Sequence, residues 1–319
     1  MKFVIVCKRQ FWGGTIIAHY LCQLLTERGY EAKMFRVPGA WHSEINESRW
    51  LFPLYCLYQE LIDVKGNIQT RLFPDSKYGK RHYTGYVHLP VSGTRRLLYP
   101  RVDDETIVVY MDVTKGNPLH AKNVVRWMCY YNRFPNDDTW YSPTDLFFDY
   151  RSQFNDPKLN PEGRILRIFH FDEDLYKRTN FGERKGNCYI VRKGSGRKDL
   201  PSHFDGPVID NLREPDKVKV LNQCERCYLY DTQTFYASIA ALCGCIPIVV
   251  PEPGKTKEDY VKPDDDDGVR GVAYGDSPDE IDFALRTRNE VQKGIDKMLA
   301  ENGPMVDSFI EKCKDYFKL

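Results

Sequence analysis

The 319-residue sequence predicts an α/β protein of two tandem domains, each built on a parallel sheet, with a cleft between them. Short apolar runs alternate along the chain with segments whose apolar residues recur at helical spacing. This alternation occurs in two series, one ending near residue 180 and one beginning near residue 187. The polar stretch KRTNFGERKG (177–186) separates them and is typical of a domain boundary.

The first series opens with a strand–helix–strand unit. KFVIVC (2–7) is a buried strand, residues 16–28 repeat apolar side chains at helical spacing, and EAKMFRV (31–37) is the next strand. Gly29 suits the C-terminal cap of that helix. A unit of this kind predicts parallel strands with a right-handed crossover. The remaining predicted elements are a strand at 106–111 that ends at Asp112, a helix at 124–131 and strands at 145–150 and 164–171.

The second series predicts a nucleotide-binding type of sheet with its own helices. Its strands are NCYIV, CYLYD, IPIVV and the short GVAYG, and its helices cover KVKVLNQC and TQTFYASIAALCG. A long polar helical region follows, and then MVDSFIEKCKDYF (305–317), which has one apolar face. We therefore predict domains at 1–180 and 181–304, with a last helix at 305–319 that packs back on the first domain.

Composition excludes some classes of function. Lys and Arg number 46 against 45 Asp and Glu, so no global charge attracts nucleic acid. No apolar run approaches the roughly 18 residues of a membrane span, and no signal peptide is evident, so we expect a cytoplasmic protein. Basic residues such as Arg95, Arg96 and Arg101 leave peripheral contact with a membrane open.

The ten cysteines are interpreted as buried thiols of a reducing compartment. Cys224 and Cys227 form CxxC, and Cys243 and Cys245 form CxC, so a structural zinc site is an alternative. The intervening strand–helix–strand pattern favours the thiols. Likewise, Asp264–Asp267 lacks the ligand spacing of a calcium loop and suits a solvated loop.

The segment DTQTFYASIAALCGCIPIVVPE (231–252) carries the chemistry. Asp231, Thr232 and Thr234 lie between a strand and the predicted start of the next helix, where free N–H groups favour an anion such as phosphate. Helix capping is the simpler explanation for one such residue. It does not explain why the following strand also ends in a polar residue, Glu252, at the same expected edge of the sheet.

The same segment resembles the donor-binding region of GT-B glycosyltransferases. The string FYASIAALCGCIPIVVPE, together with KTKEDY, GVAYG and NPLHAKNVVRW (117–127), is similar to bacterial-type polysaccharide and lipopolysaccharide-core transferases. The resemblance implies two Rossmann-like domains facing a cleft, a nucleotide-sugar donor and no obligatory metal or other cofactor. Many retaining members carry two glutamates eight positions apart. Here Asp231 takes the first position and Ile239 the second, so the resemblance does not decide between inversion and retention.

This resemblance and the strand ends together define a candidate site. In the second domain, Arg192 and Lys193 follow a strand and suit a diphosphate, alongside Asp231, Thr232, Thr234 and Glu252. In the first domain, the site comprises Gly13 and Gly14, which let backbone approach a ligand, and the catalytic candidates Asp112 and His19. Asp112 is the candidate general base, and a turn or packing role remains the alternative for each. Trp12, Trp41 and His42 are candidate acceptor contacts.

The predicted activity is glycosyl transfer from a nucleotide sugar to a glycan or polysaccharide acceptor, which includes lipid-linked glycans. Three different functions remain open. A metal-dependent GT-A transferase would use Asp172 and Asp174 of RIFHFDED. A nucleotide-sugar epimerase would bind the same donor without an acceptor. A non-catalytic carbohydrate-binding protein would suit the missing second glutamate.

Overall fold

The computed structural model describes residues 1–8, 13–37, 43–73, 96–132, 136–137, 139–232, 234–261 and 270–319. The chain forms two compact units. Unit 1 comprises Met1–His170 and Glu301–Leu319, and unit 2 comprises Phe171–Ala300. Trp12, Trp41, His42, Arg95 and Asp264–Asp267 lie outside the described residues.

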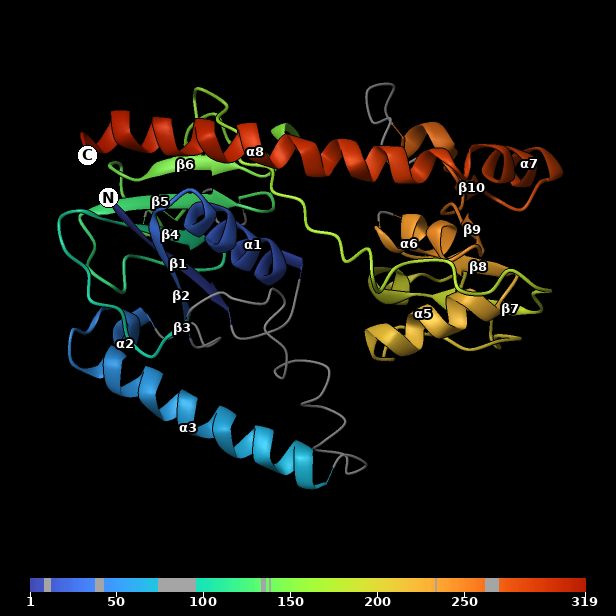
Figure 1. The fold of residues 1–319 in the computed structure, drawn as a ribbon, viewed down its shortest axis with the longest axis horizontal. Coiled ribbons are helices and arrows are strands. Elements are labelled where there is room, and N and C mark those ends of the chain that lie inside the picture. Colours follow the sequence, from blue (N-terminus) through green and yellow to red (C-terminus); the bar gives the residue numbers. More distant parts are fainter. Residues whose placement is uncertain are drawn as a thin grey trace. The chain divides into compact units, whose positions relative to one another are not determined.

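Unit 1 contains a six-stranded, all-parallel sheet in the order β3-β2-β1-β4-β5-β6 (Figure 1). This is the order of a doubly wound Rossmann sheet, with the chain reversing direction between β1 and β4. Its elements are β1 (Lys2–Lys8), α1 (Gly13–Glu27), β2 (Glu31–Val37), α2 (Ser43–Glu47), α3 (Leu51–Leu72), β3 (Arg96–Leu97), β4 (Thr106–Met111), β5 (Asn123–Met128), β6 (Leu146–Asp149) and the short 3-10 turn Ser152–Phe154.

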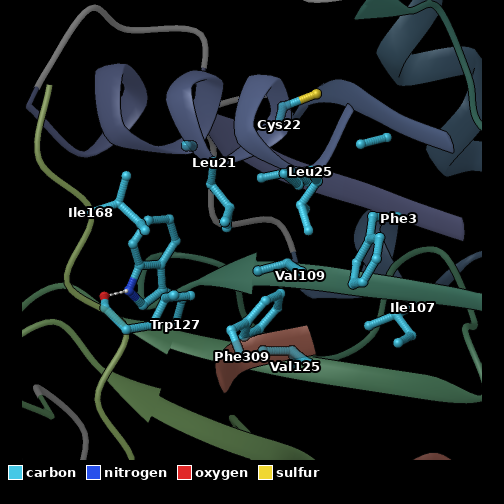
Figure 2. Packing of buried hydrophobic residues seen from close by; sticks show 14 of the residues in the cluster. Phe3, Leu21, Cys22, Leu25, Ile107, Val109, Val125, Trp127, Ile168 and Phe309 are labelled. Atoms are coloured by element: carbon cyan, nitrogen blue, oxygen red, sulfur yellow. Dashed lines mark hydrogen bonds between the residues drawn. The ribbon is translucent and has the colours of Figure 1, made fainter. Parts of the chain in front are cut away.

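The alternating side chains of β1 pack against two different layers. Phe3, Ile5 and Cys7 belong to the core that α1 and the end of α8 cover, whereas Val4 and Val6 belong to the core that contains Phe52 of α3. In the first of these cores, the indole N–H of Trp127 donates to the carbonyl of Leu166 at 2.8 Å, beside Ile168 (Figure 2). Helices on both faces account for strands that are apolar on both sides.

Unit 2 contains a four-stranded parallel sheet in the order β10-β9-β8-β7. The backbone at 207–209 runs parallel along the free edge of β7, where Tyr189 bonds to Pro207 and Ile209 at 2.9 Å each. Counting this segment, the strands follow the doubly wound order 2-1-3-4-5. The elements are β7 (Asn187–Ile190), the 3-10 turn η2 (Arg192–Gly196), α5 (Glu214–Gln223), β8 (Arg226–Leu229), α6 (Tyr236–Leu242), β9 (Ile246–Val249), the 3-10 turn Lys257–Asp259, β10 (Ala273–Tyr274), α7 (Pro278–Thr287) and α8 (Glu290–Phe317).

These sheets confirm the predicted α/β class with two Rossmann-like units. Two predicted elements were wrong. Residues 124–131 were predicted as a helix, but they form β5, which is buried along its whole length. Residues 164–171 were predicted as a strand, but only Ile165 makes a bridge, to Asp149. Within the described part of the chain, no helix is both long and apolar enough to cross a lipid bilayer.

The last helix runs without a break from Glu290 to Phe317, through Pro304. The boundary between the two units falls inside it, after Ala300. Its final turns belong to the core of unit 1, because Val306, Phe309 and Cys313 are buried with the side chains of β1 and α1.

Candidate functional site

The carboxyl edge of the unit 2 sheet has a topological switch point between β7 and β8. The chain leaves β7 toward the 207–209 segment on one side, and it leaves β8 toward β9 on the other. In open α/β sheets, ligands bind beyond the carboxyl ends of the strands at such a point. Arg192, Asp231 and Glu252 follow β7, β8 and β9 respectively, so the three residues lie along this edge as their positions in the sequence predict.

The turn after β7 is held tightly against the end of β8. The Asp210 carboxylate accepts the backbone N–H of Val191 at 3.2 Å and that of Arg192 at 2.8 Å. A Cβ at Gly194 would lie only 2.4 Å from the carbonyl oxygen of Tyr230. Only glycine fits there, so the backbone of this turn lies directly against the neighbouring strand end.

Arg192 has an uncommon backbone conformation for its residue type. Its φ is 37°, in the left-handed region that a side chain with a Cβ adopts at a cost of about 1–2 kcal/mol. The side chain is 44% exposed. Its Nε lies 4.0 Å from Oδ2 of Asp231, which is buried. The guanidinium lies 5.3 Å from the ring centroid of Tyr236, at the start of α6. The strained turn therefore presents a positively charged, solvent-accessible group at the switch point.

A half-buried network that the sequence pattern did not predict lies beneath Tyr236. The Glu214 carboxylate accepts from the hydroxyl of Tyr236 at 2.5 Å, from that of Tyr176 at 2.9 Å and from Nζ of Lys217 at 2.7 Å. Lys217 also donates to the Tyr236 hydroxyl at 2.9 Å. These bonds fix the orientation of the ring on which Arg192 rests. The only sequence signal was an acid in the first turn of α5, which is ordinary for a helix.

The same network sets the pKa values of its members. Burial alone would raise the pKa of Glu214, but hydrogen bonds from Lys217, Tyr236 and Tyr176, with the charge of Lys217, lower it below its usual value. Burial and the neighbouring Glu214 carboxylate raise the pKa of the Tyr236 phenol well above its usual value. At neutral pH the network is therefore a carboxylate that accepts from neutral phenols and a protonated lysine.

Arg197, which the sequence places in the same basic loop, has a different position. Its Nη1 donates to the carbonyl of Val250 at 2.7 Å and its Nη2 to that of Pro251 at 2.9 Å, and it pairs with Asp199. The side chain is 7% exposed. Arg197 therefore joins the turn after β7 to the end of β9, whereas Arg192 and Lys193 are exposed to solvent.

The remaining predicted residues of unit 2 lie close to this edge with local partners. Helix α6 begins at Tyr236, so Thr232 and Thr234 precede the helix that was predicted to start with them. The Thr234 hydroxyl accepts from the backbone N–H of Tyr236 at 3.4 Å. Glu252 pairs with Lys255, and its backbone N–H donates to the Tyr260 hydroxyl at 2.8 Å. Their roles in ligand binding stay predictions.

The predicted residues of unit 1 gather at its own switch point, between β1 and β4. Asp112 directly follows β4 and is half-buried. Gly14 begins α1 against that strand, because a Cβ there would lie 3.0 Å from Cε of Met111, whereas Gly13 has open space around it. His19 is fully buried in α1. Its burial favours the packing interpretation, and the catalytic roles of His19 and Asp112 stay predictions.

The acidic residues expected to hold a metal in a GT-A transferase are exposed, and each has a local contact. Asp172 accepts the backbone N–H of Leu175 at 3.0 Å, and Asp174 lies 3.4 Å from Nζ of Lys177. Among the described residues, no group of three or more His, Cys, Asp or Glu side chains is arranged to hold a metal ion.

A hollow of about 450 Å³ lies beside α5, away from the carboxyl edge of the sheet. Its lining is mixed and open to solvent, and it contains none of the residues predicted for the site. The lining residues are Thr179, Asn180, Pro215, Val218, Lys219, Asn222 and Gln223.

Comparisons with known proteins give remote structural likeness only. No protein-family model matches the chain, and no curated protein does. Among solved structures, the glycosyltransferase VinC in complex with dTDP is 10% identical, with a TM-score of 0.36 over 100% of both chains. The spinosyn rhamnosyltransferase SpnG with thymidine diphosphate is 12% identical, with a TM-score of 0.33 over 97% of this chain and 96% of that one. The glycosyltransferase SnogD from Streptomyces nogalater is 10% identical, with a TM-score of 0.33 over 96% and 95%. Likeness at this level carries no functional inference.

Proposed function

We propose that the protein is a glycosyltransferase that moves a sugar from a nucleoside diphosphate sugar to a hydroxyl of a glycan or polysaccharide. Unit 2 holds the donor diphosphate beyond the carboxyl ends of β7 and β8. The observation that carries this proposal is Arg192: a strained, left-handed residue at the switch point whose guanidinium is exposed and rests on Tyr236.

The chemistry of transfer explains why such a group is needed. When the bond between the anomeric carbon and the diphosphate oxygen breaks, its electron pair stays on the diphosphate, which gains negative charge. A positioned guanidinium stabilises that charge, because it offers two parallel N–H donors to phosphate oxygens. Lys193, exposed next to it, supplies a second cation. Tyr236 and the Glu214 network hold the guanidinium in place, so little of its freedom is lost on binding.

On the acceptor side, we assign Asp112 as the group that takes the proton from the attacking hydroxyl. A carboxylate directly beyond a central strand of unit 1 is suited to that role. We assign the fully buried His19 a packing role within α1, and Gly14 a close contact between α1 and β4. The donor is bound without an obligatory metal in this proposal, since the diphosphate charge is met by Arg192 and Lys193.

Nucleotide binding provides the direct test. UDP, GDP, CMP, dTDP and ADP are titrated calorimetrically against the full chain, each with magnesium and with EDTA. We expect one nucleotide to bind in both conditions. Arg192→Ala should weaken its binding about 10- to 150-fold, which corresponds to the about 1.5–3 kcal/mol of a charged hydrogen bond.

Arg226→Ala is the matched control. Arg226 lies on the neighbouring strand, is 38% exposed and pairs with Glu225, but it begins β8 at the opposite edge of the sheet. Its variant should bind as wild type does. Equal binding by Arg192→Ala and wild type would remove Arg192 from the site, and binding only with magnesium would favour a metal-dependent GT-A transferase.

Turnover separates glycosyl transfer from epimerisation and from binding without catalysis. A transferase releases the nucleoside diphosphate only when a suitable acceptor hydroxyl is present, apart from slow hydrolysis. An epimerase would convert the donor sugar without acceptor and without release. A carbohydrate-binding protein would bind the nucleotide sugar and turn over nothing with any acceptor.

A further inference from the structure

Five of the ten cysteines gather at the amino edge of the unit 2 sheet, opposite the proposed donor site. Cys188 in β7 and Cys227 in β8 are register partners across the two parallel strands. Cys245 directly precedes β9, and strand alternation places it on the same face as the other two, because Cys227 pairs with Pro247. Cys224 ends α5 and Cys243 ends α6, so both helix ends meet this edge.

The sulfur atoms of this group are in contact with one another. The Cys188 thiol interacts with the sulfurs of Cys224, Cys227 and Cys245, the contact with Cys224 having the largest effect on its pKa. All five are free thiols. Four have none of their surface exposed, whereas Cys224 is 8% exposed and is the member that a small oxidant reaches.

The surroundings of Cys224 favour its thiolate. Arg184 donates to the carbonyls of Leu221 at 2.9 Å and Cys224 at 3.3 Å, and to that of Cys243 at 2.6 Å, which places a guanidinium among the thiols. The hydrogen bond from Cys188 and the charge of Arg184 lower the pKa of Cys224 to about 7, against the opposing effect of burial.

The other buried thiols behave in the opposite way. Burial raises the pKa of Cys243 to about 12 and, in unit 1, that of Cys22 to about 12. Since the thiolate is the form that reacts with peroxide, the cluster contains one reactive sulfur with a protonated sulfur in contact.

We propose that Cys224 is a peroxide-reactive thiol that forms a disulfide with Cys188. In the first step the Cys224 thiolate attacks hydrogen peroxide, an S–O bond forms, the O–O bond breaks and hydroxide leaves. The sulfur is oxidised to sulfenic acid and the peroxide is reduced. In the second step the Cys188 sulfur attacks the Cys224 sulfur, its proton goes to the departing hydroxyl, and water leaves as the disulfide forms.

The described thiols favour this chemistry over metal binding. No group of three or more of these side chains, within the part of the chain that the structure describes, is arranged to hold a metal ion. A single pair in contact is sufficient for a disulfide. The resulting bond would join the end of α5 to the second residue of β7.

The test uses the full-length protein with hydrogen peroxide, followed by alkylation under denaturing conditions and mass spectrometry. Wild type should lose two alkylatable thiols and two hydrogen atoms, and the digest should contain one peptide pair that joins Cys188 to Cys224. Cys224→Ala should keep its remaining thiols. Cys188→Ala should stop at the sulfenic acid of Cys224, which dimedone traps.

Cys22→Ala is the matched control, because Cys22 is also buried beside another cysteine, Cys7, and should react as wild type does. Persistence of all thiols in wild type, or a disulfide between any other pair, overturns the proposal without depending on the folding of a variant. Binding of one Cd²⁺ or Zn²⁺ that protects four thiols from alkylation would also overturn it and assign a metal site instead.

Discussion

The ion pair between Arg126 and Asp145 in unit 1 is the most deeply buried charge pair among the described residues, and its removal has a calculable cost. Nε of Arg126 lies 2.6 Å from Oδ2 of Asp145, and the two side chains are 1% and 3% exposed. The guanidinium also donates to the carbonyls of Thr114 at 3.1 Å and Gly116 at 2.7 Å. The carboxylate accepts the backbone N–H of Ser142 at 3.1 Å.

Asp145→Ala leaves a buried cation without its counter-charge and a backbone N–H without its acceptor. Loss of one partner from a buried pair costs about 3–5 kcal/mol. For a unit of this size, about 2–4 °C in Tm corresponds to each kcal/mol, so the expected drop is about 6–20 °C. All five tryptophans lie in the first 140 residues, so tryptophan fluorescence during urea denaturation reports on unit 1.

Asp104→Ala provides the matched control. Asp104 lies 3.2 Å from Nζ of Lys122, a partner 18 positions away as against 19 for the buried pair, but the side chains are 85% and 67% exposed. Its loss should change the free energy of unfolding by about 0.5 kcal/mol or less. A cost below about 1 kcal/mol for Asp145→Ala would refute the reasoning, because it would mean that water reaches Arg126.

Two further predictions concern unit 2 and are measured by circular dichroism. Gly244→Ala should cost about 2–4 kcal/mol, because φ is 87° and the new Cβ would lie 2.5 Å from Nη2 of Arg184. Gly254→Ala, with φ 80° and open space, should cost only about 1 kcal/mol; equal losses would contradict the clash. The lowered pKa of Glu214 means that its contribution to stability is complete above its usual value of 4.5 and is lost as the pH falls through the lower folded value. Glu214→Gln should flatten this acid limb, and an unchanged limb would assign it to other carboxylates.

The sequence predicted the order of strands and helices well where alternation or helical spacing was visible, and failed where burial removed the pattern. β5 is buried on both faces, so VVRWMCYY has no polar side that distinguishes a strand from a helix. The reverse problem explains why α3 was not predicted. Phe52 and Cys56 are buried, but Leu54, Leu57 and Leu61 are exposed, so apolar residues surround the helix and no single stripe stands out.

For the candidate site, strand ends were predictable and side-chain environments were not. The positions of Arg192, Asp231 and Glu252 along one edge follow from parallel strands alone. The sequence could not separate Arg192 from Arg197, because both are basic residues of one loop, and only the fold directs Arg197 to the carbonyls that follow β9. The Glu214 network was equally hidden, since Tyr176, Glu214 and Tyr236 are far apart along the chain.

The position of the unit boundary within α8 has a consequence for synthesis on the ribosome. Unit 1 needs Val306, Phe309 and Cys313 for its core, yet its other residues end at His170. At about 5–20 residues per second, roughly 10–30 s separate the emergence of those two parts of the chain. During that interval unit 2 has all of its residues before unit 1 does. The nascent amino-terminal sheet must therefore wait with apolar surface uncovered, which makes it the part of the molecule that depends most on chaperones.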